Sequence, residues 1–140
     1  MTFRAPLLLI CGAALVAATP AVAASLNGIT PVSPKSGSTV KTGTAPTFKV
    51  KVQGDGQVWV HVCKSKKKDS EGVICTDESI GQAKKKGSTF QYKPKKFTFP
   101  GFWMVTPGTY YWQAHRIACI AGSDLSDCRQ EGPIVKFKVG

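Results

Sequence analysis

The sequence predicts an all-β fold, a sandwich of about seven short strands in one domain. From position 30 onward, apolar and polar residues alternate over short segments, with the period of a strand that buries one face. Pro and Gly residues separate these segments and are typical of turns. No stretch of 11 residues combines helical apolar spacing with capping residues. The chain has 140 residues, a size that favours a single domain.

The first expected strands lie in the N-terminal half of the chain. A ragged strand covers 29–32 and Val40, and another covers 48–52, where Phe and Val alternate with Lys. The turn at 54–56 leads into a strand at 57–63. The valines of this strand share one face, and its other face carries Trp59, His61 and Cys63.

The longest expected strand lies in the C-terminal half. Short strands at 90–93 and 97–99 come first, and the turn at 107–108 opens a strand that runs from 109 to 119. A final strand covers 135–139. Alternation directs these residues of the last two strands into the core: Tyr110, Trp112, Ala114, Val135, Phe137 and Val139.

Residues 1–24 have the pattern of a secretory signal peptide. Arg4 precedes an apolar run at 6–18, and Ala21-Val22-Ala23 offers the small residues that signal peptidase accepts. The run is shorter than the ~20 residues that span a bilayer, so we expect no transmembrane segment. Cleavage leaves one domain at 25–140, secreted to the extracellular space or the cell envelope. Because the leader contains only one charged residue, Arg4, the formal charge falls from +11 to +10.

Four cysteines follow the leader: Cys63, Cys75, Cys119 and Cys128. An even number in an exported domain predicts two disulfides, with three possible pairings, of which the spacing favours neighbours. Zinc binding and redox catalysis are not expected, because the chain has no Cys-x-x-Cys motif and only two histidines. The acidic residues near the last cysteine do not supply a full set of calcium ligands. We therefore expect no metal and no cofactor.

Several segments resemble fibronectin type III and related immunoglobulin-like domains of exported bacterial proteins. Residues 107–114 (PGTYYWQA) look like the entry to strand F of that family. Residues 31–37 (PVSPKSG) with 46–48 (PTF) resemble the openings of strands A and B, and 133–139 (PIVKFKV) resemble strand G. The resemblance implies an immunoglobulin-like sandwich in which Tyr110 is the tyrosine-corner residue.

The resemblance also implies a disulfide pairing and a core tryptophan. The strands that end at Cys63 and Cys119 would pair antiparallel, which places these cysteines about 20 Å apart at ~3.3 Å per residue. A disulfide needs Cα atoms within about 7 Å. The pairs compatible with this fold are then Cys63–Cys75 and Cys119–Cys128. Trp112 would lie in the core.

Lysine is concentrated between 64 and 96, where ten lysines accompany four acidic residues. One interpretation is a solvated edge that protects the strands from aggregation. The other is binding of an anionic polymer, a cell-envelope surface or a partner protein, for which the candidates are Lys66, Lys67, Lys68, Lys84, Lys85 and Lys86. Arginine, whose forked group reads guanine, is scarce, so we expect no sequence-specific binding of nucleic acid.

Strand alternation also predicts an aromatic and basic platform on the outer face of the sheet. This face would carry Trp59, His61, Tyr111, Gln113, His115, Lys136 and Lys138. Aromatic rings beside hydrogen-bonding groups suit sugar rings or a partner's surface. Two alternatives stay open: Trp59 lies in the core, as in many immunoglobulin-like domains, and the two histidines are ordinary surface residues.

The chain contains no motif for nucleophilic, metal-dependent or phosphate-binding catalysis, so we expect no enzyme. The expected function is that of a secreted, noncatalytic interaction module with a basic binding surface. The alternative is a small-molecule carrier, because neocarzinostatin-like proteins are also short sandwiches with two local disulfides. A carrier requires an apolar cleft lined by Phe99, Phe102 and Trp103, and otherwise these rings belong to the core.

Overall fold

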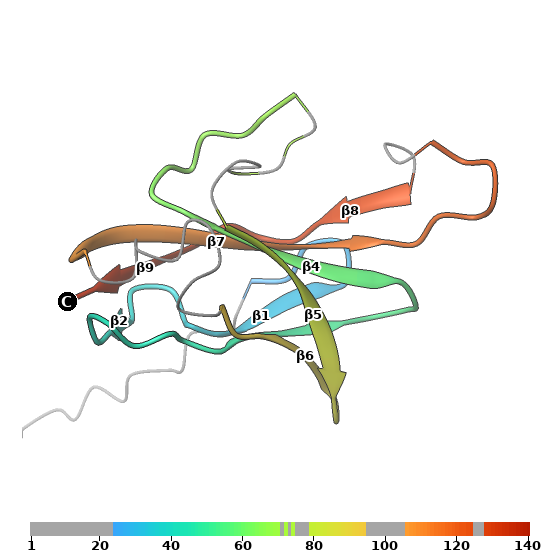
Figure 1. The fold of residues 1–140 in the computed structure, drawn as a ribbon. Helices are drawn as coiled ribbons and strands as arrows, with labels where there is room; N and C mark the ends of the chain where they lie inside the picture. Colours follow the sequence, from blue (N-terminus) through green and yellow to red (C-terminus); the bar gives the residue numbers. More distant parts are fainter. Residues whose placement is uncertain (1–23, 71, 73, 75–78, 95–105, 125–127) are drawn as a thin grey trace, which may run out of the picture.

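The computed structural model describes residues 24–70, 72, 74, 79–94, 106–124 and 128–140. Its elements are strands (Figure 1), in chain order β1 (Ile29–Ser33), β2 (Thr39–Val40), β3 (Phe48–Val52), β4 (Gln57–Cys63), β5 (Ser79–Lys86), β6 (Thr89–Tyr92), β7 (Gly108–Ile117), β8 (Arg129–Glu131) and β9 (Val135–Val139). The predicted all-β class is confirmed for this part of the chain. Residues 1–23 of the expected leader and the expected strand at 97–99 lie outside it. No helix in the described part is long and apolar enough to cross a membrane.

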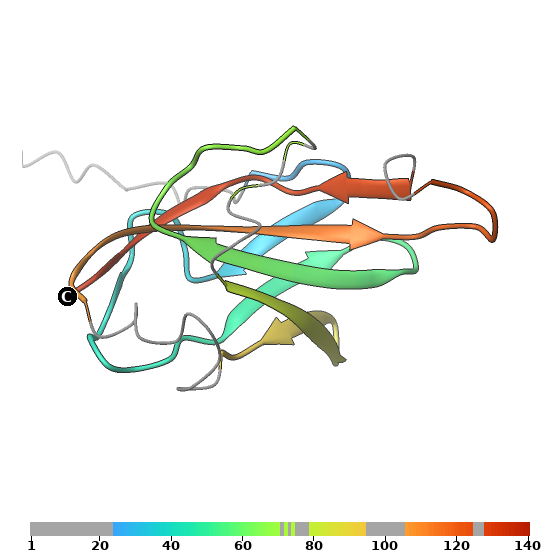
Figure 2. The same ribbon diagram turned by 45° about the horizontal axis from the view of Figure 1, so that its top comes forward.

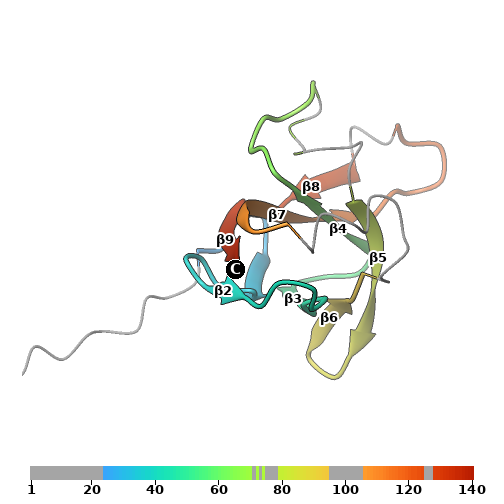
Figure 3. The same ribbon diagram turned by 60° about the vertical axis from the view of Figure 1, so that its left-hand side comes forward.

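The strands form one strongly curled sheet. Their order is β1-β3-β6-β5-β4-β7-β9-β2, and β8 pairs with β7. The curl arises at β5, because its first part pairs with β4 (Val60↔Gly81) and its last part pairs with β6 (Lys85↔Phe90). Figure 2 and Figure 3 show the result, in which β3 and β6 lie on one side, β4, β7 and β9 lie on the other, and β5 runs between them.

The sequence did not predict two of the strands, β5 and β8. The β5 sequence, SIGQAKKK, has no clear alternation of apolar and polar residues. It is nevertheless a strand, because β4 and β6 supply backbone hydrogen-bond partners along its length. Strand formation depends on such pairing more than on intrinsic preference. The short β8 likewise pairs with the end of β7.

The core lies between the two sides of the curled sheet. The residues predicted to point inward are buried: Val58, Val60, Val62, Tyr110, Trp112, Ala114, Val135, Phe137 and Val139. Phe48 of β3 joins them, and its ring centroid lies 5.4 Å from that of Trp112 and 5.9 Å from that of Phe137. β3 therefore packs across the core against β7 and β9 through edge-to-face aromatic contacts.

Two aromatic side chains of β7 also hydrogen-bond to nearby backbone. The hydroxyl of Tyr110 donates to the carbonyl oxygen of Thr106 at 2.8 Å. The indole N–H of Trp112 donates to the carbonyl oxygen of Pro34 at 3.0 Å. The side-chain donors of Tyr110 and Trp112 thus both have a backbone partner. The bond from Trp112 also holds the chain that follows β1 against β7.

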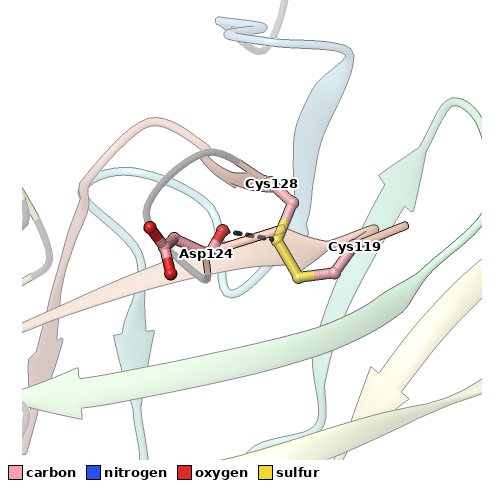
Figure 4. The surroundings of a disulfide bond; sticks show 3 residues. All are labelled: Cys119, Asp124 and Cys128. Carbon is pink, nitrogen blue, oxygen red and sulfur yellow. Dashed lines mark hydrogen bonds between the residues drawn. A yellow bond between two sulfur atoms is a disulfide. The ribbon is translucent and has the colours of Figure 1, made fainter. Parts of the chain in front are cut away.

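The predicted disulfide Cys119–Cys128 is present in the loop after β7 (Figure 4). The Cα atoms of the two cysteines are 4.8 Å apart, within the range that a disulfide can bridge. The Sγ atom of Cys128 also lies 3.3 Å from the backbone oxygen of Asp124. The two cysteines are nine positions apart in the sequence, so the disulfide is local, as expected.

Cys63 is also disulfide-bonded. Its predicted partner, Cys75, is not among the described residues. The register of β4 against β7 places Cys63 opposite Tyr111, at the end of the strand pair far from Cys119. The geometric reason for excluding a bridge between Cys63 and Cys119 is therefore confirmed.

The bend of β5 depends on the absence of a side chain at Gly81. A Cβ atom at this position would overlap the ring of Tyr92 on β6, and that ring stacks on Phe48. We predict that Gly81→Ala lowers the free energy of unfolding by about 1–3 kcal/mol, because overpacking displaces the ring. Urea denaturation measures this loss. The control is Gln82→Ala at an exposed neighbour, which should change stability by less than about 0.5 kcal/mol, and equal losses in both variants would contradict the steric explanation.

Candidate functional site

Lysines gather on the outer side of β3, β5 and β6. In one cross-strand row, Lys84 lies opposite Gln91, which in turn lies opposite Lys49. Two residues farther along their strands, Lys86 lies opposite Thr89 of β6, and Lys51 lies on the same side of β3 as Lys49. We call this set the lysine face, and its members are Lys49, Lys51, Lys84 and Lys86.

The lysine face exists because the other sides of these strands face the core. Phe48 and Val50 are fully buried, and Phe90 and Tyr92 pack against the buried cluster. Alternation directs the intervening residues outward. The members of the lysine face are exposed, except that Lys49 is half-buried.

The spacing of the lysine face allows its charges to act on one ligand. Strand separation places the backbones of Lys49 and Lys84 about 10 Å apart, and two residues along a strand span about 7 Å. These distances are close to the Debye length of about 8 Å at physiological ionic strength, so the fields of the ammonium groups overlap. No Asp or Glu occurs in β1, β3, β5 or β6. These strands therefore carry no carboxylate that offsets the positive charge.

The other predicted lysines lie on separate surfaces. Three of them are exposed in the segment after β4: Lys66, Lys67 and Lys68. Lys85 is exposed, but its register partner is Phe90, so it belongs to the opposite side of β5 from the lysine face. Lys136 and Lys138 are exposed on β9, across the core from the lysine face. The structure thus divides the predicted basic set instead of uniting it.

Sequence reasoning missed Lys49 and Lys51 as candidate binding residues. The alternation at 48–52 identified them as the polar side of a strand. Their association with Lys84 and Lys86 follows from the pairing of β3 with β6 and of β6 with β5. The only signal in the sequence was the absence of acidic residues from all of these strands.

The predicted exposed platform on β4 and β7 is wrong in its centre. The exposed fractions of His61, Gln113 and His115 are 3%, 1% and 5%, so these residues are neither a binding platform nor ordinary surface residues. Trp59 and Tyr111 are half-buried. Trp59 therefore lies at the margin of this face and outside the core cluster.

The burial has a local cause, because the chain after β4 returns over this face. Ile74 is fully buried, and its backbone N–H donates to Oε1 of Gln113 at 3.1 Å. Nε2 of Gln113 donates to the carbonyl oxygen of Gly132 at 2.9 Å. The side-chain amide of Gln113 thus ties the covering segment at Ile74 to the chain between β8 and β9. Alternation along a strand identifies the side of a residue but does not reveal a segment that covers it.

His61 and His115 form a buried pair beneath this cover. Nε2 of His61 lies 2.8 Å from Nδ1 of His115, so one nitrogen donates and the other accepts. Desolvation, followed by the proximity of His61 and Arg129, lowers the pKa of His115 to about 3. Glu131 lies opposite His115 on β8 and contacts Nε of Arg129 at 3.4 Å. The two histidines share one face of the sheet, as the alternation predicts, but that face is buried at this point.

Comparisons with known proteins assign no family to the chain. No protein-family model, no curated protein and no solved structure matches it. Within the residues that the structure describes, no group of three or more His, Cys, Asp and Glu side chains could hold a metal ion. The lysine face as a candidate site is supported by register, exposure and charge.

The buried histidine pair predicts that stability falls with acidification. His115 stays neutral in the folded chain at pH values well above 3, whereas an unfolded histidine gains its proton near the ordinary pKa of 6.5. Below about pH 6 unfolding therefore takes up one proton at this residue, which lowers the free energy of unfolding by about 1.4 kcal/mol per pH unit. The stability that the neutral His115 maintains is therefore fully present above pH 6.5, and it is lost progressively as the pH falls from 6.5 toward 3.

Denaturation curves between about pH 7 and pH 5 measure this slope, in a range above the usual carboxyl pKa values of about 4. His115→Gln removes the titrating group, so its stability should depend less on pH over this range. The control is Gln57→Ala at an exposed position of the same sheet, which should keep the full slope. Parallel pH profiles for His115→Gln and the unchanged chain would contradict the assignment.

Proposed function

We propose that this chain is a secreted, noncatalytic interaction module that binds an anionic polymer of the cell envelope through the lysine face. The observation that carries the proposal is the strand register, which gathers four lysines on one side of β3, β5 and β6 with no carboxylate in these strands. The paired strands hold the lysine backbones at fixed spacing. Binding therefore costs little ordering of the backbone.

The charge of the whole chain favours the same class of partner. The formal charge of +10 that the chain carries after leader cleavage steers polyanions toward the protein and accelerates their association. Each lysine near an anionic surface contributes on the order of 1 kcal/mol. Lysine ammonium groups recognise charge more than shape, because they lack the planar fork of arginine. We therefore expect binding that is sensitive to salt and tolerant of the detailed polymer structure.

The proposed architecture is an immunoglobulin-like sandwich of the fibronectin type III kind. The packing of Phe48 on Trp112 and Phe137 across the core supports two facing sheets, joined in this chain by the bend of β5. The hydrogen bond from Tyr110 to Thr106 supports a tyrosine corner. Three disulfide-bonded cysteines (Cys63, Cys119 and Cys128) and the leader pattern support export to an oxidising compartment.

Two other interpretations of the lysines and of the chain's function predict different observations. If the lysines only keep this side of the sheet solvated, their loss changes no binding. A small-molecule carrier requires the apolar cleft of Phe99, Phe102 and Trp103, and these three residues are outside the part of the chain that the structure describes. The lysine face favours the polymer-binding interpretation, because its charges are concentrated on one side of the sheet.

A charge-matched pair of variants tests the lysine face. The first replaces Lys51, Lys84 and Lys86 with Gln. At about 1 kcal/mol per lysine, this change should weaken binding to an acidic polysaccharide on the order of 100-fold. The control makes the same charge change in the segment after β4, at Lys66, Lys67 and Lys68. Elution from an acidic-polysaccharide column along a salt gradient measures both.

The face variant should elute at a clearly lower salt concentration than the control variant. Equal shifts would show that only net charge matters, and retention that is independent of salt would exclude an electrostatic site. If a duplex DNA column retains the unchanged protein better than a polysaccharide of similar charge density, the proposed partner class is wrong.

A further inference from the structure

A groove of about 540 Å³ opens beside the lysine face. It is bounded by the end of β1, the segment 34–40 and the start of β3. The groove meets the lysine face at Lys49, whose register partner on β1 is Ser33. One cross-strand row, Ser33–Lys49–Gln91–Lys84, therefore continues from the groove onto the lysine face.

Hydrogen bonds fasten the outer wall of this groove, the segment 34–40, to the strands behind it. The indole N–H of Trp112 donates to the carbonyl oxygen of Pro34 at 3.0 Å. The backbone N–H of Gly37 donates to the carbonyl oxygen of Lys136 on β9 at 2.8 Å. The end of the segment pairs with β9 as β2. The groove is thus formed before any ligand arrives, which limits the entropy lost on binding.

The lining of the groove combines three kinds of group. Two lysines border it: Lys35 and Lys49. Hydroxyl groups come from Ser33, Thr39 and Thr47, and apolar surface from Val40 and Pro46. The described residues that line it include no Asp or Glu. Ammonium groups suit a phosphate or carboxylate, hydroxyls suit a polyol, and apolar surface suits the carbon face of a sugar ring.

The size of the groove also fits a ligand larger than a simple anion. Small-molecule sites commonly have volumes of about 300–1,000 Å³, and this groove falls within that range. A free phosphate would leave the apolar groups of the lining without a role. A neutral sugar would leave both lysines without a counter-charge.

We propose that the groove binds one anionic sugar unit, a sugar ring that carries a phosphate or carboxylate, as an end or branch of the polymer. This inference rests on the proposed function, because the lysine face then holds the continuing polymer chain. The groove adds selectivity for sugar-containing polyanions, whereas the lysine face alone recognises charge. Lys49 serves both, since it stands where they meet.

The test is an NMR titration of the protein with glucose 6-phosphate as the probe. We expect saturable shifts of the backbone amide signals of Ser33, Thr39 and Thr47. Lys35→Gln should weaken this binding about fivefold, the equivalent of roughly 1 kcal/mol for one lysine. Lys66→Gln is the control, because it removes the same charge far from the groove in sequence, and it should leave the affinity unchanged. Glucose and inorganic phosphate are titrated in parallel.

Each outcome bears on one part of the inference. If glucose 6-phosphate causes no saturable shift at these amides, or if Lys35→Gln and Lys66→Gln behave alike, the groove is not the proposed site. Equal affinity for inorganic phosphate would show a simple anion site and overturn the sugar assignment. If the polysaccharide column retains the protein but the groove amides show no saturable shift, the groove inference is wrong and the lysine face remains the proposed binding site. Sugar phosphate binding without polymer retention would support the groove as a sugar site and overturn the polymer-binding function of the lysine face.

Discussion

The burial of Phe48 against the rings of Trp112 and Phe137 holds the two sides of the curled sheet together. It joins β3 to β7 and β9 across the core, although β3 and β7 are far apart in the sheet order. Apolar burial and edge-to-face ring contacts both stabilise this arrangement. Once β3 is fixed with Phe48 inward, the pleat directs Lys49 and Lys51 outward. The candidate binding surface is therefore a consequence of core packing.

The change of partners along β5 makes this closure possible. A single strand that pairs first with β4 and then with β6 carries the sheet around the core without a break in backbone hydrogen bonding. The same strand contributes Lys84 and Lys86 to the lysine face, beside the polar side of β6. Fold and proposed function thus share one element, and the absence of a side chain at Gly81 leaves room for the ring of Tyr92 beside it.

The two outer faces of the sheet have different environments. The face that contains His61 and His115 is covered by the chain after β4, and hydrogen bonds of Gln113 hold the covering segments. Desolvation lowers the pKa of the buried His115 and so keeps its imidazole neutral, since charging it inside the protein is costly. The face formed by β3, β5 and β6 carries lysines and no carboxylate, so charged ammonium groups keep it in contact with solvent. This contrast favours the lysine face as the surface available to a partner.

The sequence predicted the all-β class, the inward side of β4, β7 and β9, and the local disulfide at Cys119, because alternation and residue spacing are properties of neighbouring residues. It could not place the lysines of β3 beside those of β5, since residues at 49 and 84 meet only through pairing with β6. The burial of the histidine pair was likewise decided by tertiary structure. A strand pattern specifies two faces, but whether solvent or a returning segment covers a face depends on contacts between residues distant along the chain.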